Sequence, residues 1–153
     1  MDKDQLRQLI LEAYSARKEI RNYFEYFLSP DPEALFDKFA GELAKECSRG
    51  KRSCSRARIS VIRRLIADFS SYQPGEELVL KFRLEAIRLL LAASAAVRMT
   101  DTLTRGFAKL VADYIAEADK AGAVTEAFAE IRVLSDSRPS SPTLRRILHQ
   151  ALL

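Results

Sequence analysis

The 153-residue chain is short of the residue types that most metal and catalytic sites require. It has no tryptophan, a single histidine, His149, and two cysteines, Cys47 and Cys54, seven positions apart. This spacing differs from the C-x2-C pattern of zinc knuckles, and one histidine cannot complete a set of four ligands. Glycine-rich phosphate loops of the G-x-x-x-x-G-K or G-x-G-x-x-G type are also missing. We therefore predict no metal site, no cofactor and no catalytic residue.

Long apolar runs and a secretory leader are missing as well. The nearest candidate for a membrane span, residues 89–97, is nine residues long, about half of the ~18 residues that a spanning helix needs. The first residues, MDKDQ, include two acids, and no long apolar run follows them, so we expect no signal peptide. Two cysteines without a secretory signal are typical of reduced thiols. We predict a cytoplasmic protein without a membrane span.

Glycine and proline, which interrupt regular structure, are scarce and clustered, with five of each in the chain. Between them apolar residues recur at steps of three and four, and no segment shows the short alternation typical of strands. Apolar residues make up 48% and charged residues 30% of the chain, which are the values of globular proteins. We predict an all-α fold that forms a single helical domain over residues 1–153.

The apolar period and the turn residues predict seven helices. The longest is expected over residues 2–28, where only Arg17 interrupts the apolar stripe. Two pairs of later helices each take about 35 to 45 residues, near the period of helical-repeat solenoids, but they share no consensus, so we favour a globular bundle over a short solenoid. The six further helices are expected at about residues 32–47, 56–71, 76–98, 101–121, 124–134 and 143–152.

Some helix ends carry local signals of their own. Asp31 can cap the second helix, and Pro32 suits its first position because the missing N–H would be unpaired there anyway. Thr100 or Asp101 is expected to cap the fifth helix. Gly122 is expected to end that helix in the left-handed conformation.

The positive charge of the chain is concentrated in one segment. The chain carries a net +4, yet residues 1–46 carry −3 and residues 68–153 carry zero. Residues 47–67 hold seven lysines and arginines and no acid. Such a cationic segment attracts phosphates, acidic protein surfaces or other anionic surfaces. This basic segment is therefore the place where we expect function.

Seven residues of the basic segment are predicted to bind an anion. They belong to a loop over residues 48–54, to the start of the following helix, where Ser55 is expected to be the N-cap, and to the outer face of that helix. Free N–H groups and the positive end of the helix dipole suit such a start to phosphate or carboxylate. The seven residues are Arg49, Lys51, Arg52, Ser55, Arg56, Arg63 and Arg64.

Arg58 is expected to have a structural role within the same segment. Helical spacing places it at the edge of the apolar face defined by the isoleucines of this helix. A charged group at such an edge needs a partner. We predict that Arg58 pairs with a carboxylate of another helix, with Glu42 and Glu46 as candidates.

Several short motifs resemble a known family. They are YFEYFL at residues 23–28 followed by Pro30, Lys51-Arg52, SRAR at residues 55–58 with Ser60, and Asp68-Phe69. Together they resemble a family of small all-helical bacterial proteins that is catalogued as a domain of unknown function, over about residues 20–75. The resemblance implies an all-α fold and a bacterial source. It implies no activity, cofactor or site residue.

Three functions remain open at this point. The first is a non-catalytic binding module that docks an anionic partner, with nucleic acid the commonest such partner in a cytoplasm. The second is a protein-interaction or scaffold domain, in which the same arginines meet an acidic protein surface or a second copy of the chain, as in a homo-oligomer. The third is an enzyme that acts on a phosphorylated small molecule held at the start of the helix over residues 56–71.

Overall fold

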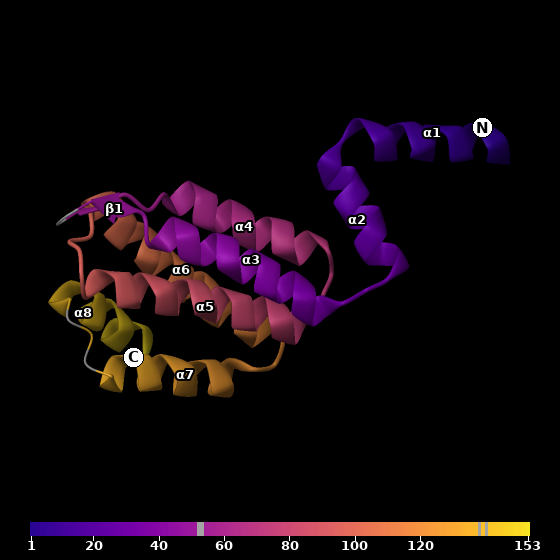
Figure 1. Ribbon diagram of the computed structural model, residues 1–153. Coiled ribbons are helices and arrows are strands. Elements are labelled where there is room, and N and C mark those ends of the chain that lie inside the picture. The colour runs from indigo at the N-terminus through magenta and orange to yellow at the C-terminus, as the bar shows by residue number, and fades with distance from the viewer. Residues whose placement is uncertain (52–53, 138, 140) are drawn as a thin grey trace. The chain divides into compact units, whose positions relative to one another are not determined.

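The computed structural model describes residues 1–51, 54–137, 139 and 141–153. Within these residues the chain forms eight α-helices and two strands of two residues each, so the predicted all-α fold is confirmed (Figure 1). The chain divides into two compact units, Met1–Ala34 and Leu35–Leu153.

The N-terminal unit contains α1 (Lys3–Ala16) and α2 (Lys18–Leu28), so the prediction of one helix over residues 2–28 is wrong. Arg17 separates the two helices with extended backbone angles, φ −135° and ψ 128°. It is the one charged position on the apolar stripe, and neither helix contains a buried residue. Because most helical stability comes from packing an apolar face, an unburied stripe does not keep this position helical.

Local polar contacts form the N-terminal unit. Asp2 and Gln5 make a capping box at the start of α1, in which each side chain accepts a hydrogen bond from the other residue's N–H, at 2.8 and 3.0 Å. Across the break, the hydroxyl of Tyr14 donates to Glu25 at 3.1 Å, and the guanidinium of Arg21 lies 5.6 Å from the centre of the Tyr14 ring. These two contacts join α1 to α2.

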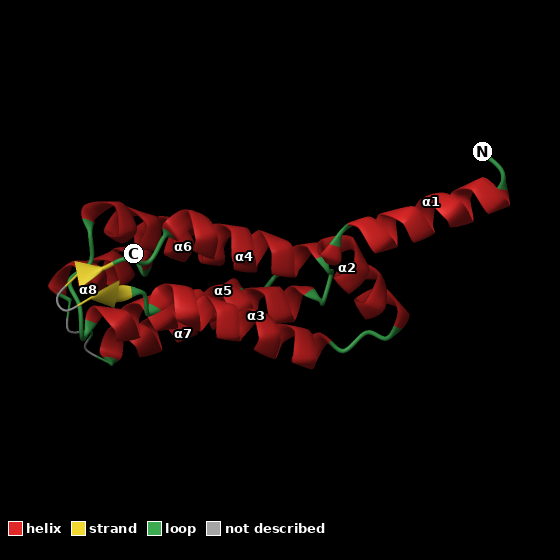
Figure 2. Cartoon of the chain, turned by 45° about the horizontal axis from the view of Figure 1, so that its top comes forward, coloured by secondary structure: helices red, strands yellow, loops and turns green. Residues whose placement is uncertain are grey.

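The second unit takes in the remaining elements, beginning within the first turn of α3. A hairpin of two short antiparallel strands lies where a loop over residues 48–54 was predicted, at one end of the helices (yellow in Figure 2). The elements are α3 (Pro32–Cys47), β1 (Gly50–Lys51), β2 (Cys54–Ser55), α4 (Ile59–Ser71), α5 (Glu76–Ser94), α6 (Asp101–Lys120), α7 (Val124–Asp136) and α8 (Pro142–Ala151).

The predicted helix ends with strong local signals are confirmed. The carboxylate of Asp31 accepts a hydrogen bond from a backbone N–H of the first turn of α3 at 3.1 Å, and Pro32 is the first residue of that helix. Thr100, rather than Asp101, is the N-cap of α6, and its hydroxyl accepts from a backbone N–H at 3.2 Å. Gly122 follows α6 with φ 71°.

Four phenylalanines join α3, α4 and α5 at the centre of the second unit. Phe69 of α4 and Phe82 of α5 are fully buried, with ring centres 4.7 Å apart. Phe36 and Phe39 of α3 pack their rings edge-on against both, at 5.6 to 6.3 Å. Aromatic pairs of this kind contribute about 0.5–1.5 kcal/mol each beyond the area they bury. The cluster therefore packs α3 against α4 and α5.

Helices α4 and α6 approach each other closely at a glycine. A Cβ atom added to Gly106 of α6 would lie 2.3 Å from Cγ1 of Ile59, the first residue of α4. Only glycine leaves room for Ile59 there. The close approach brings the start of α4 beside the first half of α6.

We predict that Gly106→Ala lowers the free energy of unfolding by about 1 kcal/mol, because the overpacking penalty of about 1–3 kcal/mol exceeds the gain of about 1 kcal/mol in helix propensity. Gly41→Ala in α3 is the matched control, since nothing lies within 4 Å of its Cβ position and the exchange should stabilise the chain. Urea unfolding measures both. The penalty should disappear in an Ile59→Ala background, and a Gly106→Ala protein as stable as Gly41→Ala would contradict the close contact.

Candidate functional site

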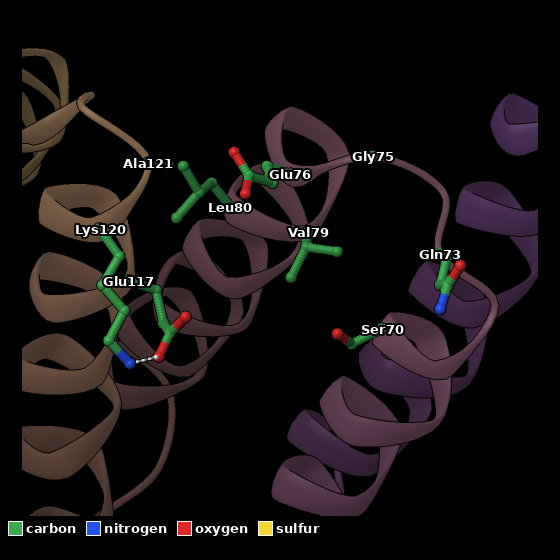
Figure 3. Close-up of a pocket in the computed structure, with 9 residues that line it drawn as sticks. All are labelled: Ser70, Gln73, Gly75, Glu76, Val79, Leu80, Glu117, Lys120 and Ala121. Carbon is green, nitrogen blue, oxygen red and sulfur yellow. Dashed lines mark hydrogen bonds and ion pairs between the residues drawn. The ribbon is translucent and has the colours of Figure 1, made fainter.

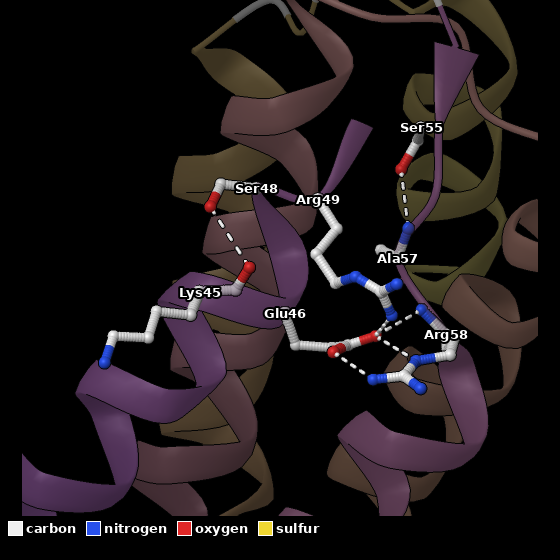
Figure 4. A network of polar contacts seen from close by, with 7 residues as sticks. All are labelled: Lys45, Glu46, Ser48, Arg49, Ser55, Ala57 and Arg58. Carbon is white, nitrogen blue, oxygen red and sulfur yellow. Dashed lines mark hydrogen bonds and ion pairs between the residues drawn. The ribbon is translucent and has the colours of Figure 1, made fainter. Parts of the chain in front are cut away.

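Glu46, near the end of α3, is the centre of the polar contacts around the basic segment (Figure 4). Its side chain is 7% exposed. Nε of Arg58 donates to Oε1 at 2.9 Å and Nη2 donates to Oε2 at 3.1 Å, while the backbone N–H of Arg58 donates to Oε1 at 2.9 Å. Nη1 of Arg49 adds a fourth hydrogen bond at 3.3 Å. The prediction that Arg58 pairs with a carboxylate of another helix is confirmed, and Glu46 is the partner.

The ion pair places the protein's own carboxylate at the start of α4. Arg58 is the N-cap of α4, and its side chain does not cap the helix. The side-chain hydrogen bonds from Arg58, assisted by its backbone N–H and by Arg49, lower the pKa of Glu46 from 4.5 to about 2. Glu46 is therefore ionised at neutral pH. It bonds to the N–H of the N-cap residue, next to the helix start that the sequence suggested for an external anion.

The prediction that Ser55 caps the helix is wrong. Ser55 lies in β2, is buried, and its hydroxyl accepts a hydrogen bond from the Ala57 N–H at 3.3 Å. The helix begins four residues later, at Ile59. Arg58 has extended backbone angles, φ −105° and ψ 113°, and its N–H bonds to Glu46, a contact that the local sequence does not reveal.

The hairpin joins the basic segment to a distant part of the chain. Gly50 faces Ser55, and a Cβ at Gly50 would lie 2.8 Å from a backbone oxygen of β2, so glycine is required at this crossing. The N–H of Arg56 donates to the carbonyl of Arg49 at 2.8 Å. The N–H of Ser55 donates to the carbonyl of Arg98, between α5 and α6, also at 2.8 Å.

The structure separates the predicted anion-binding residues into groups. Arg49 pairs with Glu46, and Nη2 of Arg63 lies 4.0 Å from a carboxylate oxygen of Asp113 in α6. Arg56 and Arg64 are exposed and form no ion pair within the described part of the chain. Arg52 lies outside the described residues, and of Lys51 the structure describes the backbone in β1.

Two arginines that the sequence analysis missed lie beside this segment. Residues 98–109 run alongside residues 54–64, because the hairpin bonds to Arg98 and Gly106 contacts the first residue of α4. Arg98 and Arg105 are exposed and have no ion pair among the described residues. Asp101 is the exposed carboxylate of the same stretch. We define the α4/α6 basic surface as Arg56, Arg64, Arg98 and Arg105.

The cysteines near the basic segment differ in environment. Burial, together with the nearby Glu46 and Glu85, raises the pKa of Cys47 to about 12. Cys47 is a protonated, packed thiol at neutral pH and not a nucleophile. Cys54 is an exposed free thiol on β2. Among the described residues, no group of three or more His, Cys, Asp and Glu side chains is arranged to hold a metal ion.

A cavity of about 390 Å³ lies away from this surface, at the other end of α4 (Figure 3). It is bounded by the end of α4, the turn before α5 and the end of α6, and Gln73 and Gly75 shape that turn with φ 52° and 113°. Its lining contains an ion pair in which Lys120 donates to Glu117 at 2.9 Å. The charges there are of both signs, so the cavity does not extend the basic surface.

Comparison of the chain with protein-family models, curated proteins and solved structures gives no match. The resemblance over residues 20–75 therefore stays a prediction. Within the described residues, no helix has the length and apolarity needed to cross a membrane.

We predict that Glu46→Gln lowers the free energy of unfolding at pH 7 by about 2 kcal/mol, because two arginines lose their charged acceptor. Glu42→Gln is the matched control. Glu42 lies one turn earlier on α3, is exposed, and has no ion pair among the described residues, so its exchange should change stability by less than about 0.5 kcal/mol. Urea unfolding compares the two. Equal losses in both variants would contradict a central role for Glu46.

The contribution of Glu46 should also depend on pH. Its pKa of about 2 in the folded chain lies below the ordinary value of 4.5, so the stabilisation is complete above about pH 4.5 and is lost as the pH falls toward 2. The stability difference between the natural chain and Glu46→Gln should shrink over this range. A difference that stays constant down to pH 2 would show that the pairing does not depend on the charge.

Proposed function

We propose that the chain is a non-catalytic binding module that docks nucleic acid on the α4/α6 basic surface. One observation carries the proposal: two segments far apart in the sequence, residues 54–64 and 98–109, lie side by side, and each carries exposed arginines that form no ion pair among the described residues. Arg49 and Arg58 of the basic segment are held by Glu46, and Arg63 lies near Asp113. The arginines of the α4/α6 basic surface are therefore available to an anion from outside, whereas Arg49 and Arg58 are held by Glu46.

The chemistry of the surface favours phosphates over isolated carboxylates. Each guanidinium presents donors in a planar fork that matches phosphate oxygens. Arg56, Arg64, Arg98 and Arg105 come from a strand exit, two helices and a loop, so a partner that contacts all four must carry several negative charges at intervals. A nucleic-acid backbone carries such a row. Contacts of this kind position a nucleic acid without reading its bases.

We predict a steep salt dependence of RNA or DNA binding. If the four arginines each neutralise a phosphate, log K should fall with log salt at a slope of about −3.6, or about 150-fold between 50 and 200 mM. Fluorescence anisotropy of a labelled oligonucleotide measures the slope. A slope near zero, or no binding at low salt, would reject the proposal.

Charge-matched variants separate this surface from the overall charge. Arg64→Gln/Arg105→Gln should weaken binding and reduce the slope by about 1.8. The control, Arg132→Gln/Arg146→Gln, removes two exposed arginines from α7 and α8 and should leave the slope nearly unchanged. Equal effects of both pairs would show non-specific attraction. Tighter binding of an acidic peptide than of an oligonucleotide would favour an acidic protein as the partner.

A second candidate function, self-association, rests on the N-terminal unit. Taken by itself, this unit buries none of its residues, whereas an apolar helical face is ordinarily stabilised by being covered. Its seven acids and five bases over residues 1–34 nearly balance, so two copies would not repel each other strongly. We propose that a second copy of this unit covers the face. The large exposed apolar residues are Leu6, Leu9, Ile10, Leu11, Phe27 and Leu28.

We predict that the chain sediments as a dimer and that Phe27→Ser/Leu28→Ser shifts it to a monomer. These side chains are 68% and 80% exposed, and burying each of them in a dimer would contribute about 2 kcal/mol to the free energy of association. Val133→Ser, an exchange at a 62% exposed position of α7, is the control and should leave the dimer intact. A monomer at all concentrations would contradict this function, as would amide protection of residues 1–34 in a monomer, which indicates packing within one chain.

A further inference from the structure

A small cleft between α4, α5 and α6 carries charges that neither the basic surface nor the aromatic core uses. Its volume is about 170 Å³, and it lies within the second unit. It is lined by Arg63, Ile66 and Ala67 of α4, Arg83 of α5, and Leu110 and Asp113 of α6. We propose that this cleft binds inorganic phosphate.

Arg83 is the first reason. It is half-buried on α5, and its Nε is shielded from solvent and has no hydrogen-bond acceptor among the described residues. A buried donor without an acceptor costs about 1–3 kcal/mol, and more when the group is charged. Such groups in native proteins are ordinarily satisfied by an ordered water or an ion. The guanidinium of Arg83 lines the cleft, and an anion there would supply the opposite charge.

The balance of charge around the cleft is the second reason. Asp113 is the carboxylate that lines it, and the ammonium of Lys109 already bonds to it. Nη2 of Arg63, at 4.0 Å from Asp113, is beyond hydrogen-bond distance and keeps its donors. Glu117, one turn further along α6, is paired with Lys120 and also interacts with the charge of Arg83, which helps to lower its pKa. Four cations, Arg63, Arg83, Lys109 and Lys120, thus face two carboxylates, Asp113 and Glu117, and the positive charge is in excess.

Asp113 makes the cleft selective among anions. A carboxylate repels a fully deprotonated anion, but it accepts a hydrogen bond from an anion that retains a proton. Inorganic phosphate keeps at least one proton at neutral pH, whereas sulfate has none to donate. The arginines would then bind the phosphate oxygens while Asp113 accepts from the P–OH group. This combination of donors and one acceptor fits phosphate better than sulfate.

The site does not depend on nucleic-acid binding, because Arg63 and Arg83 are not members of the α4/α6 basic surface. Arg64→Gln/Arg105→Gln, which should weaken oligonucleotide binding, should leave phosphate binding in the cleft unchanged. Failure of one proposal can therefore be told apart from failure of the other.

The test is a titration of the folded full chain with inorganic phosphate at constant ionic strength, followed by the arginine Nε–Hε resonances in proton–nitrogen NMR spectra. We expect saturable shifts for Arg83 and Arg63 and none for Arg132, which is exposed on α7. Sulfate should bind at least about tenfold more weakly, the loss of roughly one hydrogen bond. Glycerol phosphate, which has mostly lost its second proton at neutral pH, should bind more weakly than inorganic phosphate in a parallel titration. Saturable binding of inorganic phosphate supports the site, and its absence overturns it.

Variants complete the test. Arg83→Gln should abolish the saturable shift, and Arg63→Gln, at a half-exposed side chain, should weaken it about tenfold. Asp113→Asn should remove the preference for phosphate over sulfate. Shifts of all arginines alike, binding unchanged in both arginine variants, or equal affinity for sulfate in the natural chain would overturn the proposal. Backbone amide spectra confirm that each variant is folded.

Discussion

The buried carboxylate of Glu46 is the contact on which the arrangement of the basic segment depends. It accepts two hydrogen bonds from the side chain of Arg58, one from its backbone and one from Arg49. These bonds connect the end of α3, the two-stranded hairpin and the start of α4. A carboxylate this well supplied with charged donors stays ionised at all but strongly acidic pH. Removing it would leave two arginine side chains and the backbone N–H of Arg58 without their acceptor.

This internal pairing reduces the number of positive charges that are available to a partner. Seven cations in residues 47–67 suggest a uniform patch, but Glu46 pairs with Arg49 and Arg58 within the fold, and Arg63 lies at the cleft near Asp113. The segment that carries the exposed Arg56 and Arg64 adjoins residues 98–106 through Ser55 and Ile59. The basic surface is thus a product of two segments. Its proposed partner is recognised by the spacing of its phosphates rather than by the overall charge of the protein.

The two units differ in what stabilises them. The second unit has a buried aromatic cluster in which Phe36, Phe39, Phe69 and Phe82 join three helices. The N-terminal unit has capping and polar contacts but no buried residue. Interactions of that kind contribute about 1 kcal/mol each or less. Most of the stability of the N-terminal unit would therefore come from the surface of a second copy that covers its apolar face.

The sequence alone determined the all-α class, most helix positions and several helix ends, because those depend on contacts within one or two turns. Asp31, Pro32, Thr100 and Gly122 act on their own helix termini, so their effect could be predicted. The pairing of Arg58 also followed from its position on the helix face. Three features could not be predicted, because each depends on groups distant in the sequence: the break at Arg17, the start of α4 at Ile59 and the burial of Ser55. Charge along a chain also says nothing about which helices lie side by side. Only the tertiary structure therefore placed the segment with Arg98 and Arg105 beside the basic segment and formed the cleft that Arg83 lines.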